Sequence, residues 1–211
     1  MKIKLLIIFL VFLLAGCKKI EKNNDNYIDL VTNCLNDFSI TNNVSLGYKY
    51  YVPKGVKKVK DFDYNQIFLI DDSKVYLYVD VISYFYDKEI LLENNSDYFY
   101  YHDINYNNKQ GYIKITKEKN KDYFVSIFYN YAKIEFYTEY ENLNKMITLT
   151  SIILNSIEYN DTIIEKVLKG DLGEFSEFTY EVEKPADANS NFSQYLEEYV
   201  QKEKEEQLPD E

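Results

Sequence analysis

The only histidine of the chain, His102, is followed directly by Asp103 inside a run that predicts a strand, residues 97–106. An imidazole beside a carboxylate is the arrangement of a general base, so this pair is the candidate centre of a hydrolase-like site. The chain contains no G-x-S-x-G, H-E-x-x-H or C-x-x-C motif that would supply a nucleophile or a metal. An isolated His-Asp pair is more often a surface pair, so we expect no catalytic residue.

Cysteine is the second residue type here with covalent chemistry, and Cys17 follows a short apolar run. The segment Leu5–Ala15 (LLIIFLVFLLA) follows Lys2 and Lys4 and is shorter than the about 20 residues of a membrane span. These features are typical of a secretory signal peptide. The run closes with Leu-Ala-Gly-Cys at 14–17, which resembles the lipobox of bacterial lipoproteins.

The lipobox resemblance implies that residues 1–16 are removed and that Cys17 carries a diacylglycerol-derived lipid. Two or more acyl chains give stable anchoring, since each buried methylene contributes about 0.8 kcal/mol. We therefore expect a membrane partner through the lipid on Cys17 and a location on the extracytoplasmic face of the cell membrane. Residues 17–26 then form the lipidated cysteine and a polar tether. The alternative is an ordinary signal peptide that carries a cysteine by chance.

Cys34 lies in NYIDLVTNCLNDF, whose apolar residues recur at helical spacing. With Cys17 alkylated, Cys34 has no partner for a disulfide within the chain. No histidine or lysine accompanies it on this apolar face to lower the thiol pKa. We expect a buried thiol on the core face of a first helix rather than a reactive one.

Metal and nucleic-acid chemistry are disfavoured. Asp61, Asp63 and Asn65 imitate the start of a calcium loop, but Gln66 replaces its glycine and Asp72 its last, bidentate glutamate. The net charge is −11, or −13 without residues 1–16, and all basic residues are lysines. An acidic chain without arginine is poorly suited to nucleic acid. We expect no metal, no cofactor and no nucleic-acid partner.

The elements of the central region are strands followed by a late helix. Aromatic and β-branched runs predict strands at 48–52, 64–70 and 75–86. They also predict a hairpin of 97–106 with 110–118, and a long run, 122–138, bent near Asn130. From residue 141 apolar residues fall three and four apart, which predicts a helix laid on the sheet. The pattern indicates an α+β domain at 27–168 built on an antiparallel sheet.

This order of elements resembles the PsbP-like α/β/α sandwich. The phrase YNYAKIEFYTEYENLNKMITLTSIILNSIEYND is also similar to uncharacterised lipoproteins of low-GC Gram-positive bacteria. The first resemblance implies an antiparallel sheet flanked by helices and a non-catalytic accessory role. It rests on pattern, so it concerns the fold more than the function.

The C-terminal part is acidic. Residues 161–211 hold 15 acids and 5 lysines, a net charge of −10. TIIEKVLKG predicts a short helix with Thr162 and Glu165 as a capping box and Gly170 as its stop. Residues 169–211 form an extension: EFTYEVEKP predicts a last strand or an extended strap, and the end is expected to be disordered. A helix over 191–205 has one apolar face, which either docks on its own domain or binds a partner: Phe192, Tyr195, Leu196, Tyr199 and Val200.

The chain has 23 tyrosines, many of them on the predicted strands. Exposed on one face they would stack on glycan rings or bind a protein; turned inward they would be core, and the sequence alone does not choose. We expect a lipid-anchored extracytoplasmic accessory or binding protein that is not an enzyme, with an envelope protein or glycan as partner. The alternatives are an envelope enzyme built on His102 and nearby acids, or an adaptor acting through helix 191–205. The tyrosines on the predicted strands are Tyr48, Tyr50, Tyr76, Tyr78, Tyr84, Tyr86, Tyr98, Tyr100 and Tyr101.

Overall fold

The computed structural model describes residues 26–37, 40–90, 98–119 and 122–171. In chain order their helices and strands are α2 (Tyr27–Asn36), β1 (Asn43–Ser45), β2 (Tyr48–Tyr50), β3 (Val56–Phe62), β4 (Asn65–Ile70), β5 (Ser73–Val79), α3 (Val81–Phe85), β6 (Tyr100–Tyr106), β7 (Lys109–Lys117), β8 (Asp122–Tyr129), β9 (Ala132–Glu139), the 3-10 turn η1 (Tyr140–Asn142), α4 (Leu143–Asn155), β10 (Glu158–Tyr159) and α5 (Asp161–Leu168).

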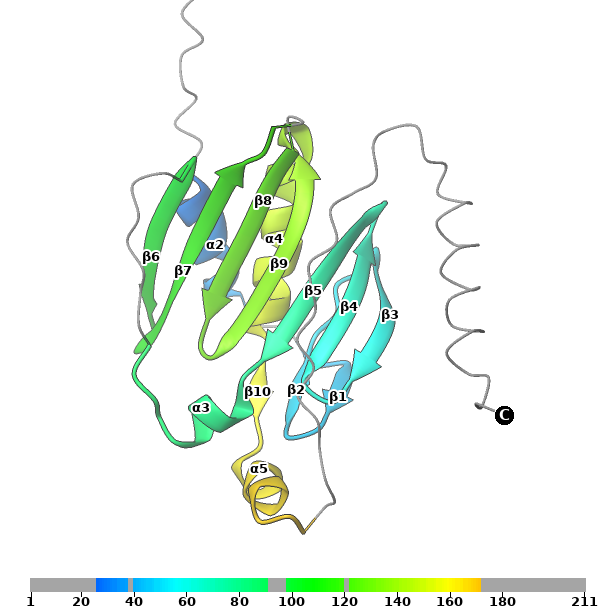
Figure 1. Cartoon of the computed structure of the whole chain (residues 1–211), viewed down its shortest axis with the longest axis vertical. Helices are drawn as coiled ribbons and strands as arrows, with labels where there is room; N and C mark the ends of the chain where they lie inside the picture. The colour runs from blue at the N-terminus through cyan, green and yellow to red at the C-terminus, as the bar shows by residue number, and fades with distance from the viewer. Residues whose placement is uncertain (1–25, 38–39, 91–97, 120–121, 172–211) are drawn as a thin grey trace, which may run out of the picture.

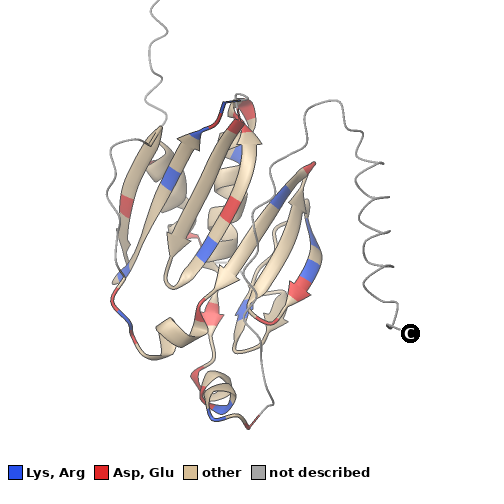
Figure 2. Ribbon diagram, viewed as in Figure 1, with Lys and Arg blue, Asp and Glu red and all other residues tan. Residues whose placement is uncertain are grey.

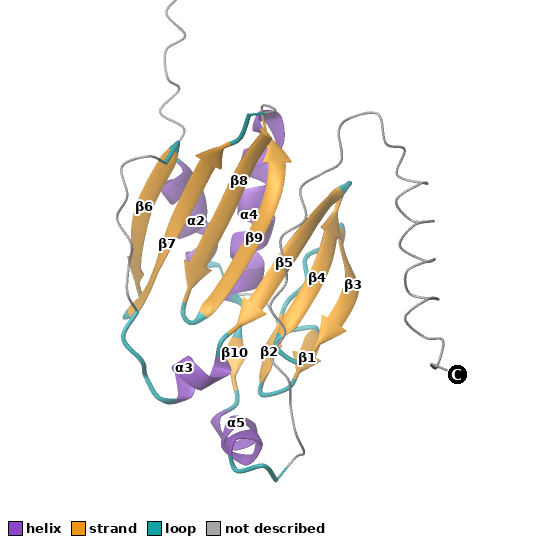
Figure 3. Ribbon diagram, in the orientation of Figure 1, coloured by secondary structure: helices purple, strands orange, loops and turns teal. Residues whose placement is uncertain are grey.

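Within these residues the strands form two sheets (Figure 1, Figure 3). The larger has the order β3-β4-β5-β9-β8-β7-β6 and the smaller the order β1-β2-β10. Every neighbouring pair in both sheets is antiparallel. With the helices, this arrangement confirms the predicted α+β class built on an antiparallel sheet.

Both long helices and the smaller sheet lie on the same face of the larger sheet (Figure 1). Helices α2 and α4 pack against each other and cover the part formed by β6, β8 and β9. The smaller sheet covers the other part: the Tyr50 ring lies 6.2 Å from the Phe68 ring of β4. The Tyr48 hydroxyl of β2 donates to Gln66 Oε1, also of β4, at 2.7 Å.

The core between these layers follows from the two periodicities of the sequence. In β8 and β9 every second residue points to the helices and is fully buried, as Ile127 and Ile134 are. Helix α4 turns its predicted face to the sheet. The buried residues of that face are Leu143, Met146, Ile147, Thr150, Ile153 and Leu154.

The predicted strand 75–86 is wrong in its second half. Strand β5 ends at Val79, and residues 81–85 form helix α3. Asp80 causes the change, because its carboxylate accepts a hydrogen bond from the Ser83 amide at 2.8 Å and so caps a helix.

The predicted capping box of the last helix is also wrong. Helix α5 begins one residue before Thr162, and Asn160 is its cap, accepting from the Ile163 amide at 3.2 Å. The predicted stop is confirmed: Gly170 has φ +77°, and its amide donates to Val167 O at 2.9 Å.

Strand β3 is an element that the sequence reasoning missed. Its lysine-rich sequence, VKKVKDF, has little apolar alternation, and its pairing with β4 is irregular between Lys58 and Lys60. It forms the outer strand of the larger sheet beside β4. Lysines and bulges on an outer strand discourage pairing with other chains.

Candidate binding face

One face of the larger sheet has no described element on it, and we call it the open face (Figure 1). We divide it into two halves by their side chains, using alternation and register. The lysine half, on β3, β4 and β5, carries Lys57, Lys60, Phe62, Ile67, Leu69, Lys74, Tyr76 and Tyr78. The aromatic half, on β6 to β9, carries Tyr101, Asp103, Tyr112, Lys114, Asp122, Phe124, Ser126, Phe128, Lys133, Glu135, Tyr137 and Glu139.

Four rings cross the aromatic half in a line, the aromatic row: Tyr98, Tyr101, Tyr112 and Phe128. Their successive centroids are 5.7, 6.2 and 5.7 Å apart, and the planes differ by 24°, 19° and 19°. Such nearly parallel rings at these distances are offset-stacked pairs. All four are half-buried, so the row is a pre-ordered apolar ridge that solvent still reaches.

Polar groups hold the row in place. Lys114 Nζ lies 5.3 Å from the Tyr98 centroid and 5.8 Å from the Tyr112 centroid, within cation–π range. The Tyr101 hydroxyl donates to Asp103 Oδ1 at 2.8 Å. Partial burial, and then this hydrogen bond, raise the pKa of Tyr101. The Tyr101 hydroxyl is therefore a neutral donor at physiological pH.

Beside the row, toward the middle of the sheet, lies a small polar group. Ser126 is fully buried, and its hydroxyl donates to Glu135 Oε1 at 3.1 Å. Lys133 Nζ lies 3.1 Å from the same oxygen. The three groups satisfy one another, so this centre is better suited to fixing side chains than to accepting a proton in a reaction.

The structure does not bring His102 and Asp103 together as an acid–base pair. The two side chains point to opposite faces of β6, because they are neighbours in a strand. Both residues are exposed, and His102 Nδ1 donates to the Asp103 carbonyl oxygen at 2.7 Å. The Asp103 carboxylate accepts from Tyr101 instead.

Cys34 occupies the predicted core position. It is 6% exposed on α2, and its thiol donates to the Thr148 carbonyl of α4 at 3.6 Å. Desolvation, and then the nearby Asp37 carboxylate, raise the thiol pKa. A raised pKa keeps the thiol protonated and unreactive.

Among the described residues no group of three or more His, Cys, Asp or Glu side chains could hold a metal ion. In the calcium-like stretch, Asp61 pairs with Lys58 and accepts from Gln66 Nε2 at 3.1 Å. Residues 61 and 62 end β3, and Asn65 and Gln66 begin β4, so the stretch is a hairpin turn.

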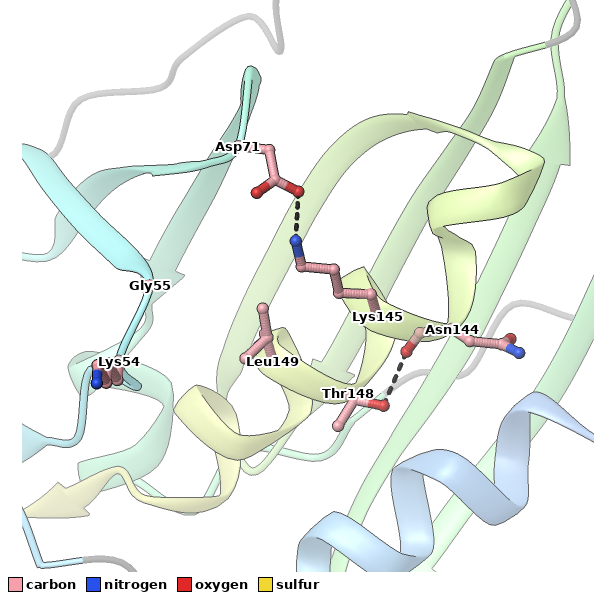
Figure 4. A pocket seen from close by; sticks show the side chains of 7 residues that line it. All are labelled: Lys54, Gly55, Asp71, Asn144, Lys145, Thr148 and Leu149. Carbon is pink, nitrogen blue, oxygen red and sulfur yellow. Dashed lines mark hydrogen bonds and ion pairs between the residues drawn. The ribbon is translucent and has the colours of Figure 1, made fainter.

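A hollow of about 540 Å³ lies between α4 and the turns beside β3 and β5 (Figure 4). Lys145 Nζ lies 2.5 Å from the Asp71 carboxylate, and the Thr148 hydroxyl donates to the Asn144 carbonyl at 2.7 Å. The remaining wall is Lys54, Gly55 and Leu149. With its acid and its hydroxyl already bonded, the hollow presents no nucleophile–base pair. His102 does not line it.

The tyrosines divide between the two faces of the sheet. Tyr48 and Tyr50 are buried in the core, and Tyr100 packs edge-on against Tyr27 of α2 at 5.1 Å. Tyr84 stacks on Tyr159 at 3.7 Å, and Tyr86 is 61% exposed away from the strands. The open face takes Tyr76, Tyr78, Tyr98 and Tyr101.

Tyr112 and Phe128 are site residues that the sequence reasoning did not name. Both pair across β7 and β8, and the signal that identifies them is the register of two hairpins. With Asn107–Asn108 and Asn130–Tyr131 as turn residues at positive φ, alternation places Tyr101, Tyr112 and Phe128 on one face.

Two predicted sites lie outside the described residues. They are the lipidation site, Cys17, and the apolar face of helix 191–205, with Phe192, Tyr195, Leu196, Tyr199 and Val200.

In the described part of the chain, none of the helices combines the length and apolar character that crossing a bilayer requires. Comparison of the chain with protein-family models, curated proteins and solved structures gave no match.

Proposed function

We propose that this chain is a lipid-anchored extracytoplasmic binding protein that uses the aromatic row as its binding surface and carries out no catalysis. The anchor is Cys17, inferred from the lipobox-like sequence at 14–17 after a short apolar run. The partner we propose is a protein of the cell envelope.

The aromatic row is the observation that carries the proposal. Stacked aromatic side chains on an exposed sheet face offer a large apolar area at little entropic cost, as binding surfaces require. Because neighbouring rings stack, the faces of the inner rings, Tyr101 and Tyr112, are partly covered. A row whose inner ring faces are partly covered and which carries tyrosine hydroxyls suits a polypeptide with apolar and hydrogen-bonding groups better than a flat sugar ring.

The arrangement of polar groups favours binding over an envelope enzyme. His102 and the Asp103 carboxylate lie on opposite faces of β6, and the hollow beside α4 lacks His102. A hydrolase-like site needs a base within hydrogen-bond reach of a nucleophile or water in a cavity. The residues considered as an acid–base pair do not meet that requirement here.

The experiment that tests the binding surface is site-specific photo-crosslinking in the native membrane. In one variant a benzophenone amino acid replaces Tyr112 of the aromatic row. In the matched control it replaces Tyr86, which is exposed at the C-terminal end of α3. We expect one protein adduct from position 112 that is absent from position 86. The same adducts from both positions, or adducts to glycan alone, would contradict the proposal.

The anchor is tested separately with Cys17→Ser. Without the thiol no lipid can be attached, so the protein should move from the membrane fraction to the soluble fraction. Metabolic labelling with an alkynyl fatty acid checks this, with Cys34→Ser as the matched control that keeps its label. Label that persists on the Cys17→Ser protein would exclude lipidation at Cys17.

A further inference from the structure

Two large side chains at the centre of the lysine half are buried although no described element lies on that face. Ile67 and Tyr76 are 7% and 8% exposed, although they point away from α2, α4 and the smaller sheet. The aromatic half is equally uncovered by described elements, yet the rings of its row remain half-exposed. Large side chains at the centre of the lysine half are thus buried more deeply than the rings of the aromatic row, which is the difference that a further segment lying on the lysine half alone would produce.

The charge of the lysine half indicates what covers it. Its open-face positions on β3, β4 and β5 hold Lys57, Lys60 and Lys74 and include no acidic residue (Figure 2). Register places Lys57 and Lys74 on either side of Leu69, and Lys60 beside Ile67. An occupant that fits has an apolar strip for the centre and carboxylates for the margins.

A segment of the same chain has this pattern. Residues 175–183, FSEFTYEVE, alternate apolar and polar side chains from Phe178 through Tyr180 to Val182, with four glutamates in or next to the run. The four are Glu174, Glu177, Glu181 and Glu183. An extended segment of this kind presents its apolar side to a sheet face while its glutamates reach outward to lysines at the edges.

The chain leaves the domain at a suitable place. Ile164 of α5 is buried against the β1–β2 turn, where a side chain on Gly47 would come within 2.7 Å of it. The Ser45 hydroxyl of β1 donates to the Asp63 carbonyl in the β3–β4 turn at 2.5 Å. Helix α5, which precedes the last described residue, Asp171, therefore lies beside the β1–β2 turn, which itself contacts the β3–β4 turn. Four residues span up to about 14 Å, and nine extended residues about 30 Å, enough to follow β4 along its length.

From these observations we propose that residues 175–183 lie as an extended strap across the lysine half of the open face. The apolar side of the strap covers Ile67, Leu69 and Tyr76, and its glutamates pair with Lys57, Lys60 and Lys74. The aromatic row stays outside the strap, so this inference does not depend on the proposed binding partner. It also gives the acidic extension a fixed starting point on the domain.

The first test uses two neighbouring substitutions in the chain 17–211 carrying Cys17→Ser. Tyr180→Asp puts a charge on the apolar side of the strap, and Thr179→Asp puts the same charge on the opposite side. The readout is relaxation of the Ile67 δ1 methyl by a soluble paramagnetic agent, with the buried Ile113 methyl as internal reference. We expect Tyr180→Asp to raise the Ile67 rate severalfold and Thr179→Asp to leave it unchanged. Equal rates in both variants and the parent would overturn the proposal.

The second test is zero-length carbodiimide crosslinking, which joins a lysine to a carboxylate in direct contact. We expect links from Lys57, Lys60 or Lys74 to Glu177, Glu181 or Glu183, and their loss in Tyr180→Asp. Mixing nitrogen-15-labelled and unlabelled chains distinguishes links within one chain from links between two. Links confined to one isotope support the strap; mixed-isotope links would place a second copy on the face, and absence of these links would overturn the proposal.

Discussion

On the lysine half of the open face three lysines surround an apolar centre, and no acidic residue is present among its described positions. The aromatic half carries stacked rings, two lysines (Lys114 and Lys133) and four carboxylates, those of Asp103, Asp122, Glu135 and Glu139. The two halves also differ in what lies beneath them. The smaller sheet backs the lysine half, and the helices α2 and α4 back the aromatic half (Figure 1).

One continuous sheet therefore offers two surfaces of unlike chemistry. A basic, apolar surface is suited to an acidic amphipathic segment, and such a segment is present in the same chain. A stacked aromatic surface with an acidic margin repels that segment and stays open to another molecule. The predictions below test whether the two halves are as independent as their chemistry indicates, beginning with the largest effect.

The largest effect on the stability of the fold is expected at alkaline pH, because buried tyrosines lie under both halves of the open face. Burial raises the pKa of Tyr129, under the aromatic half, to about 12, and strongly raises those of Tyr48 and Tyr50, under the lysine half. An unfolded tyrosine ionises near pH 10. The folded state therefore holds these protons more tightly, and the stabilisation present below about pH 10 is lost as pH rises to 12 and beyond.

Tyrosinate absorbance and denaturant unfolding across this pH range check the prediction. In Tyr129→Phe stability should fall less steeply between about pH 10 and about pH 12, while the loss from Tyr48 and Tyr50 should remain. Stability that stays constant from about pH 9 to about pH 12 would contradict the assigned burial.

The second effect is at Gly111 in β7, where β7 and β8 approach closely. A Cβ there would lie 2.0 Å from the Phe128 carbonyl oxygen and 2.9 Å from Tyr129 Cα, and backbone atoms of a paired strand cannot move aside cheaply. We expect Gly111→Ala to destabilise the fold by about 3 kcal/mol and to disturb the aromatic row.

Gly55, before β3 in the lysine half, is the matched control. It has φ +92° but nothing within 4 Å of an added Cβ, so Gly55→Ala carries only backbone strain, about 1 kcal/mol. Denaturant unfolding of both variants measures the difference. Equal destabilisation would show that close packing of β7 on β8 is not what requires glycine.

The sequence was sufficient to predict the elements whose apolar residues recur with one clear period. Helix α4 appears because its apolar residues fall at helical spacing, and the hairpins appear because Asn107 and Asn130 interrupt alternating runs. It was insufficient where a local contact overrides the run. Asp80 caps α3 inside an apparently continuous strand pattern, and β3 is lysine-rich because it lies at the edge.

The aromatic row shows why the candidate site was only partly predictable. Tyr98 and Tyr101 stand in an evident aromatic run, but Tyr112 and Phe128 come from two other strands. They meet only when the register of three strands is known, and a shift by one residue would turn each ring to the core. Tyrosine content alone contains no information on that register.

A third, smaller effect is expected at Cys34, which helps fix α2 under the aromatic half. The thiol is buried and donates to Thr148 of α4. Cys34→Ser places a more polar hydroxyl in the same space, so we expect a loss of about 1 kcal/mol. Thiol-modifying reagents should react with native Cys34 only after unfolding, which mass spectrometry over a denaturant series measures. Rapid modification of the native protein would place Cys34 outside the core.

The smallest effect is expected at Lys114, and it separates the two halves most directly. Its ammonium lies over the rings of Tyr98 and Tyr112, so Lys114→Gln should lower stability by about 0.5 kcal/mol through the lost cation–π contacts. The glutamine side chain is neutral and somewhat shorter than lysine, so it covers the rings of Tyr98 and Tyr112 less completely and exposes them more to water. The aromatic proton resonances of Tyr98 and Tyr112 should shift, while the resonance of the Ile67 methyl in the lysine half should not.

Lys74→Gln, in the lysine half, is the reciprocal control and should shift resonances near Leu69 without shifting those of the aromatic row. If either substitution moved both sets of resonances equally, the two halves would behave as one surface, and a strap on one could not leave the other free to bind.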